Sequence, residues 1–319
     1  MDLSDYARVL ALELLNQYQD HISAISLLEQ VLDPRHIGFI ATPLLFSGLH
    51  YASFFGIVEL VTELINAAGY EVGQQDCTGR TPLAWAARNG HERVVKILLE
   101  RKNVDPNRTD KNNLTPLGWT AIKGHEGVVK LLLEQENVDP NRLDKSGEGP
   151  LGWAAICGHG GVAKLLLGQG DVNPDHPGRY DRTPLGNAAM EGHEEVVKLL
   201  LERGDVDPNR PDVYDRTPLG NAALKGHKGV VKLLLERDNV DPNRPDMNDR
   251  TPLVCATMGG HEGVVKLLLE REEVDPNRPD KHGGTPLSYA CMEGYGKVVQ
   301  LLQARKSIKP PDTQLPHPL

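Results

Sequence analysis

Six histidines recur at a fixed spacing and are the first candidates for metal chemistry. They are His91, His125, His159, His193, His227 and His261, and glutamate directly follows four of them. A zinc-protease helix needs a second histidine one turn later, but valine occupies that position in most copies, as at Val95 and Val265. Stacked helices lie about 8–10 Å apart, whereas two nitrogens on one zinc lie within about 4 Å. We therefore predict no metal site, and we expect the histidines to order the turn between two helices through hydrogen bonds.

Other motifs that suggest chemistry have simpler explanations. Cys157 and His159 lie in a glycine-rich stretch, which is only one copy of the Gly-His turn that recurs along the chain. Residues 294–297 read Gly-Tyr-Gly-Lys, without the other glycine and the serine or threonine of a nucleotide P-loop. The four cysteines show no Cys-x-x-Cys spacing, so neither a zinc site nor a disulfide framework is indicated. We predict no catalytic residue and no cofactor, and we do not expect an enzyme.

Composition excludes several classes of partner. The 319-residue chain has a formal charge of -9, so no basic face is expected to bind nucleic acid or anionic lipid. No apolar run approaches the roughly 20 residues of a membrane span, and the first residues lack the basic-then-apolar order of a signal peptide. Cysteines without a disulfide pattern favour a reducing compartment. We expect a monomer in the cytoplasm, with the nucleus as an alternative location.

The organisation of the chain follows from one repeated motif. Thr-Pro-Leu begins at Thr81, Thr115, Thr183, Thr217, Thr251 and Thr285, and Gly149 begins a variant copy, so each step is 34 residues. One step before Thr81 lies Ser47, which begins a degenerate first copy. The predicted repeats 1 to 8 are 47–80, 81–114, 115–148, 149–182, 183–216, 217–250, 251–284 and 285–308. Residues 1–46 are predicted to be a helical N-terminal cap, and 309–319 a Pro-rich disordered tail.

Repeat 6 illustrates the structure expected of each copy. Thr217 can cap a short helix whose first turn accepts Pro218, and Gly226 can end it in the left-handed conformation. The apolar stripe from Val230 to Leu235 predicts a second, buried helix. The following residues are rich in Asp, Pro and Asn and predict an extended hairpin loop that leads to the next Thr-Pro-Leu. Each repeat is therefore expected to be helix, helix and hairpin loop.

The repeated pattern Thr-Pro-Leu-x-x-Ala-Ala-x-x-Gly-His-x-x-Val-Val-x-Leu-Leu-Leu, followed by Val-Asp-Pro-Asn, closely resembles the ankyrin repeat family over 47–308. The Val-Asp-Pro-Asn loop and Trp85 are similar to those of long arrays in fungal proteins. The resemblance implies an all-α solenoid. The family's usual period is 33 residues, and its usual histidine after Thr-Pro-Leu is replaced by Gly118, Gly152, Gly186 and Gly220, which is expected to loosen local hydrogen bonding. Gln303 replaces the leucine of earlier copies and suggests that repeat 8 is a C-terminal cap.

The resemblance also implies where a partner binds. In ankyrin proteins the residues after the Ala-Ala pair and the hairpin tips line a concave groove. Here the first of these positions holds Phe54, Arg88, Ile122, Ile156, Met190, Leu224, Met258 and Met292. All but one are apolar, which favours an interaction surface, and the methionines suit a surface that adapts to its partner. The alternative is that the helix tilts and buries these side chains against the next repeat. The hairpin tips add Tyr180 and Tyr214, with Arg182, Arg216 and Arg250 behind them.

A second series of residues suggests a different function. Trp85, Trp119 and Trp153 are followed at the same position by Asn187 and Asn221. The indoles are expected to pack between repeats, although a partly open indole could anchor a ligand. Our leading hypothesis is a non-enzymatic scaffold that binds a protein segment along the groove, chiefly in repeats 4 to 7. The alternative is a small-molecule-binding protein or enzyme with a pocket at Trp119, Trp153, Asn187 and Asn221. A third hypothesis, the sensor region of a larger receptor, is less consistent with terminal caps.

Overall fold

The computed structural model describes residues 47–67 and 71–308. These residues form sixteen α-helices and a short 3-10 helix, and they contain no strand. The chain divides into two compact parts, Met1–Asn173 and Pro174–Leu319. The predicted N-terminal cap (1–46) and Pro-rich tail (309–319) lie outside the described residues. The expected all-α repeat fold is confirmed.

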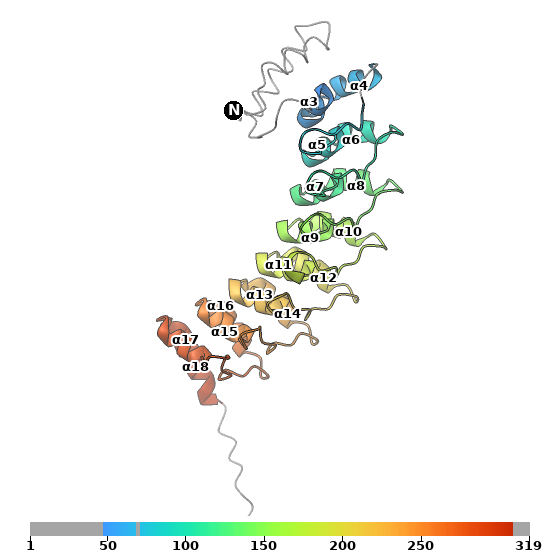
Figure 1. Ribbon diagram of the computed structural model, residues 1–319. Coiled ribbons are helices and arrows are strands. Elements are labelled where there is room, and N and C mark those ends of the chain that lie inside the picture. Colours follow the sequence, from blue (N-terminus) through green and yellow to red (C-terminus); the bar gives the residue numbers. More distant parts are fainter. Residues whose placement is uncertain (1–46, 68–70, 309–319) are drawn as a thin grey trace, which may run out of the picture. The chain divides into compact units, whose positions relative to one another are not determined.

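The N-terminal part stacks its helices in two layers (Figure 1). The first helix of each repeat packs against the first helix of the next, and the second helices do the same. The first-helix layer contains α3 (Gly48–Phe55), α5 (Pro82–Arg88), α7 (Pro116–Lys123) and α9 (Pro150–Cys157). The second-helix layer contains α4 (Val58–Asn66), α6 (Glu92–Leu99), α8 (Glu126–Leu133) and α10 (Gly160–Leu167).

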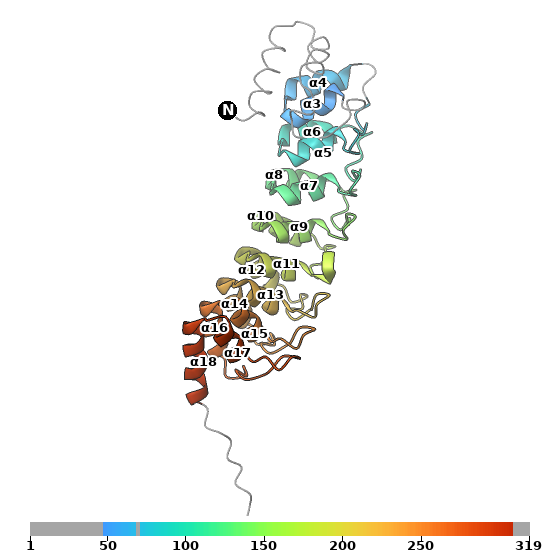
Figure 2. The ribbon, with the colours of Figure 1, turned by 60° about the vertical axis from the view of Figure 1, so that its left-hand side comes forward.

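The C-terminal part repeats this arrangement and carries hairpin loops on one side of its helices (Figure 2). It begins with the 3-10 helix η3 (Arg179–Asp181). Its first helices are α11 (Pro184–Glu191), α13 (Pro218–Lys225), α15 (Pro252–Met258) and α17 (Pro286–Met292). Its second helices are α12 (Glu194–Leu201), α14 (Lys228–Leu235), α16 (Glu262–Leu269) and α18 (Gly296–Ile308).

The predicted helix ends are confirmed by their hydrogen bonds. The hydroxyl of Thr217 accepts a hydrogen bond from the N–H of Gly220 at 3.1 Å, and Pro218 lies in the first turn. Gly226 ends α13 with φ of 78°. Gly149 replaces the threonine before α9 and has no side chain for this bond. The threonine hydroxyl satisfies a backbone N–H that the helix itself cannot, which is why the helix begins at this residue.

Small and branched apolar side chains form the core between the layers. Leu219, Ala222 and Ala223 of α13 are fully buried, and so are Val230 and Val231 of α14. The alanines let neighbouring first helices approach closely, while the valines and leucines fill the space between first and second helices. Burial of each larger side chain stabilises the fold by about 1.5–3 kcal/mol relative to exposure.

The recurring histidines connect consecutive repeats. In the N-terminal part the Nε2 atom of His159 lies 3.1 Å from the carbonyl oxygen of Ile122, 37 residues earlier. In the C-terminal part His261 Nε2 lies 3.1 Å from the carbonyl oxygen of Leu224. We expected these histidines to order the turn between two helices through hydrogen bonds, and the structure adds a bond to the preceding repeat. Within each part, these imidazoles bond to the end of the preceding repeat's first helix, where helical carbonyl groups have no partner of their own.

Candidate functional site

The groove positions lie half-buried at the ends of the first helices. In the C-terminal part Met190, Leu224 and Met258 are half-buried, while Met292 is 70% exposed. In the N-terminal part Ile122, Ile156, Phe54 and Arg88 are also half-buried. Neighbouring residues cover part of the half-buried side chains, but these side chains do not enter the core. Histidine bonds to the backbone of Leu224 and Met190 hold these positions in place.

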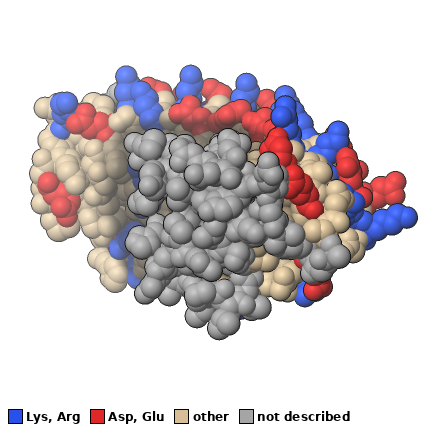
Figure 3. Space-filling model, turned by 90° about the horizontal axis from the view of Figure 1, so that it is seen from above, with Lys and Arg blue, Asp and Glu red and all other residues tan. Residues whose placement is uncertain are grey.

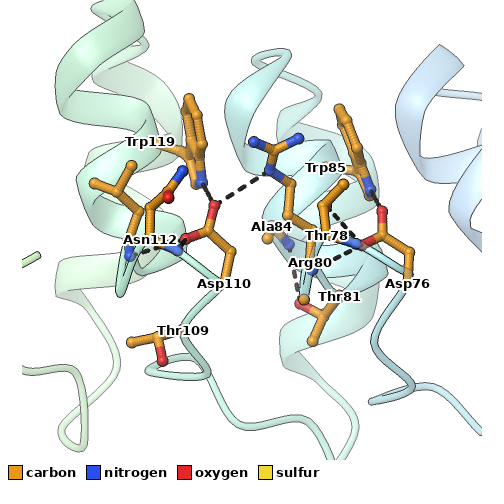
Figure 4. A network of polar contacts seen from close by, with 12 residues as sticks. Asp76, Thr78, Arg80, Thr81, Ala84, Trp85, Thr109, Asp110, Asn112 and Trp119 are labelled. Atoms are coloured by element: carbon orange, nitrogen blue, oxygen red, sulfur yellow. Dashed lines mark hydrogen bonds and ion pairs between the residues drawn. The ribbon is translucent and has the colours of Figure 1, made fainter. Parts of the chain in front are cut away.

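Asp110 joins its hairpin to the first helix of the next repeat and to the end of the preceding repeat (Figure 4). Asp110 Oδ1 accepts hydrogen bonds from the backbone N–H groups of Asn112 and Leu114 at 2.8 and 3.1 Å. Its Oδ2 accepts from Trp119 Nε1 at 3.1 Å and from Arg80 Nε at 3.3 Å. The carboxylate is nearly buried, so these four donors compensate for the water it loses.

Two arginines pack against the indoles of Trp85 and Trp119. The Arg80 Cζ atom lies 4.7 Å from the Trp85 ring centroid and 4.5 Å from that of Trp119, and Figure 4 shows its guanidinium between the two rings. Arg88 lies 5.3 and 5.1 Å from the same rings. Burial, and then the charge of Arg80, lowers the pKa of Arg88. These two indoles pack between repeats as expected, with guanidinium groups between them rather than one indole stacked on the other.

The predicted tip arginines of the C-terminal part form longer ion pairs with buried aspartates. Arg182 Nε and Arg216 Nε lie 3.5 and 3.6 Å from Asp212 Oδ2, which also accepts a hydrogen bond from Asn221 Nδ2 at 3.2 Å. Arg250 Nε lies 3.8 Å from Asp280 Oδ2. These aspartates were not among the predicted site residues. The signal that could have revealed them is an aspartate nine residues before the Trp, Asn or Tyr position in most repeats, as between Asp212 and Asn221.

Residues of the alternative pocket bond to aspartates of the preceding hairpin loop, as Asn221 does to Asp212 at 3.2 Å. Trp119 and Trp153 are half-buried, and Trp153 Nε1 donates to Asp144 Oδ2 at 3.0 Å. Asn187 and Asn221 are buried. Two cavities, of about 260 and 210 Å³, lie beside Arg237 and Arg108, and none of the four residues lines either cavity. A pocket at these residues therefore stays a prediction.

The hairpin tips of the C-terminal part expose aromatic and apolar side chains. Tyr180 and Tyr214 are 43% and 40% exposed, and their ring centroids lie 6.4 Å apart. Val213 and Met247, which were not among the predicted site residues, are 49% and 54% exposed beside them. Tyr180 has φ of 64°, a left-handed conformation that is costly for a bulky side chain. The Arg216 Cζ atom lies 4.5 Å from the ring centroid of Tyr214.

Charges are mixed on the molecular face that Figure 3 shows, where basic and acidic side chains are interspersed along the rim. No group of three or more His, Cys, Asp or Glu residues within 47–67 and 71–308 is arranged to hold a metal ion. In the same ranges, no helix has both the length and the apolar character that a bilayer crossing requires.

Comparison with known families agrees with the repeat geometry. The family model for ankyrin repeats in three copies matches residues 49–144, 102–176, 151–246 and 239–312. A search of curated proteins gives no match. The matched segments overlap and cover most of the chain, and ankyrin repeats are in general protein-interaction modules. The chain belongs to the ankyrin repeat family.

Proposed function

We propose that this protein is a non-enzymatic scaffold that holds a segment of a partner protein along the groove of its C-terminal part. The observation that carries the proposal is the distribution of exposed apolar side chains. Among the described residues, the large apolar side chains that are exposed are Tyr180, Val213, Tyr214, Met247 and Met292. All lie in the C-terminal part, on hairpin tips or in the groove row. Clustered exposed apolar side chains are typical of interaction surfaces.

The groove row supports the same conclusion. Met190, Leu224 and Met258 are half-buried, so a partner can remove their remaining surface from water without rearranging the core. Capped helices carry all three side chains, and histidine bonds fix the backbone of Met190 and Leu224. A pre-formed surface loses little conformational entropy on binding. Methionine side chains adjust to the shape of the segment that binds.

The test replaces the three groove side chains together by lysine, in the variant Met190→Lys, Leu224→Lys and Met258→Lys. A matched control carries Leu199→Lys, Leu233→Lys and Leu267→Lys, which add the same charge at half-buried positions of the second helices. The groove variant is expected to lose partner capture, while the control retains it and both keep the helical circular dichroism signal.

A photo-crosslinking amino acid identifies the contact directly. Placed at Met258 it is expected to crosslink a defined segment of the partner, and placed at Leu267 it is not. Equal crosslinking from both positions, or unchanged capture by the groove variant, would contradict the groove assignment.

A further inference from the structure

Three hairpin tips of the C-terminal part form one row. We call Tyr180, Val213, Tyr214 and Met247 the tip patch. The carbonyl oxygen of Tyr180 accepts a hydrogen bond from the N–H of Val213 at 3.0 Å, and that of Tyr214 accepts from Met247 at 3.0 Å. These bonds join each tip to the next, so the exposed side chains lie on one continuous surface.

The tyrosine rings of this patch favour apolar groups in the part of a ligand that contacts them. The two rings are tilted by 35° with centroids 6.4 Å apart, and each ring already packs against a guanidinium. The Arg216 Cζ atom lies 4.5 Å from the Tyr214 ring, and the Arg179 Cζ atom lies 4.8 Å from the Tyr180 ring. A ring whose negative quadrupole already faces one cation attracts a second cation weakly. The exposed ring surface therefore suits proline or aliphatic side chains.

The charges beside the patch favour basic groups in the parts of the same ligand that lie next to the rings. Each tip carries one exposed aspartate in a left-handed conformation, namely Asp181, Asp215 and Asp249, with φ of 53°, 57° and 58°. Arg216 and Arg250 lie behind the tips, where the buried Asp212 and Asp280 hold their Nε groups. Arg179 is exposed beside Asp181. Asp215 and Asp249 lie on the other two tips, away from Arg179. We therefore expect the cationic groups of a ligand to bind these two carboxylates.

The separation of the tips selects the conformation of the ligand. Consecutive repeats lie about 8–10 Å apart, the usual distance between packed helices. A polyproline II segment rises about 3.1 Å per residue with three residues per turn, so positions i and i+3 share a face about 9.3 Å apart. In a β-strand, positions i and i+3 point to opposite faces. A polyproline II segment therefore places one basic residue at each of two consecutive tips.

We propose that the tip patch binds a proline-containing segment in polyproline II conformation, with basic residues at positions i and i+3. The basic residues pair with Asp215 and Asp249, and the intervening prolines pack against Tyr214, Val213 and Met247. This proposal rests on the scaffold function proposed above and specifies the chemistry of one partner segment.

The test measures fluorescence anisotropy of a labelled nine-residue peptide with three Lys-Pro-Pro units, titrated with the full chain at low salt. Peptides with Glu-Pro-Pro or Lys-Gly-Gly units are expected to bind at least about tenfold more weakly, because they lack the charge or the preformed conformation. Higher salt is expected to weaken the Lys-Pro-Pro complex, since exposed charges are screened.

Variants assign the binding to the tip patch. Asp215→Asn with Asp249→Asn is expected to weaken binding about two- to fivefold for each carboxylate removed. Asparagine tolerates the left-handed backbone, as Asn113 does with φ of 65°. Tyr214→Ser is expected to weaken binding about tenfold. The charge-matched control is Glu202→Gln with Glu270→Gln, at the exposed residues that directly follow α12 and α16, and it is expected to bind as the unaltered chain does.

Two results would overturn the tip proposal, namely equal affinity for all three peptides, or no loss of binding in the Asp215 and Asp249 variant. A failure here is distinguishable from a failure of the groove proposal. Crosslinking from Met258 without any peptide binding contradicts only the tip proposal, whereas peptide binding without that crosslinking contradicts only the groove assignment.

Discussion

Replacing Asp175 by asparagine should stabilise the C-terminal part. At the equivalent position of the next repeat, the Asn209 side chain makes two hydrogen bonds to the backbone of the following repeat, and we call this pair of bonds an asparagine clamp. The substitution should let the same pair of bonds form one repeat earlier. In the intact clamp, Asn209 Nδ2 donates to the carbonyl oxygen of Asn239 at 2.6 Å, and its Oδ1 accepts from the N–H of Asp241 at 2.9 Å. Asp175 occupies the equivalent position one repeat earlier, and its Oδ2 accepts from the N–H of Asp207 at 2.7 Å. An ionised carboxylate has no N–H with which to make the second bond.

The magnitude follows from one hydrogen bond and one charge. A typical intramolecular hydrogen bond contributes about 0.5–1.5 kcal/mol. Burial raises the pKa of Asp175, and the charges of Asp207 and Asp205 also raise it. The hydrogen bond from the Asp207 N–H lowers this pKa, but the net direction is upward. A raised carboxyl pKa adds stability that is fully present below the unfolded-state pKa and is lost as pH rises through the folded-state pKa. The Asp175→Asn variant should therefore be about 1 kcal/mol more stable at pH 7.5, and its advantage should shrink on acidification.

Urea unfolding followed by far-UV circular dichroism at pH 7.5 and pH 4.5 measures both effects. The matched control is Asn209→Asp, which breaks an intact clamp and should lower the free energy of unfolding at pH 7.5 by about 1 kcal/mol. The reasoning is refuted if Asp175→Asn is no more stable than the unaltered chain at pH 7.5, or if the stability difference between them does not depend on pH.

Two other predictions concern single sites. Gly226→Ala should lower the free energy of unfolding by about 1–3 kcal/mol, because φ is 78° and the added Cβ would overlap the imidazole of His261. Gly204→Ala, where a Cβ meets open space, should change it by no more than about 0.5–1 kcal/mol, and comparable losses in urea unfolding would contradict the argument. Burial raises the pKa of the Cys255 thiol to about 12, so iodoacetamide at pH 8 should modify the exposed Cys291 and reach Cys255 only after unfolding. Peptide mass spectrometry would refute this if both thiols react at similar rates in the folded protein.

The helices of each repeat could be predicted from local sequence alone. The hydroxyl of Thr217 begins the helix by accepting from an N–H three residues later, and Gly226 ends the same helix. Each of these two signals acts within one turn of the backbone. The period of 34 residues repeats these local signals and thereby specifies that equivalent helices stack. The same register placed the groove positions at the ends of the first helices.

The contacts between repeats were decided only by the tertiary structure. Arg80 pairs with Asp110, 30 residues later, and His159 bonds to the backbone of Ile122, 37 residues earlier. The period shows that such positions come near each other, but the direction of each side chain depends on the packing around it. The exposure of Val213 and Met247 has the same origin. The sequence by itself determined the repeat and its helices, because these depend on neighbouring residues, whereas the clamps and the exposed tip patch depend on how one repeat packs against the next.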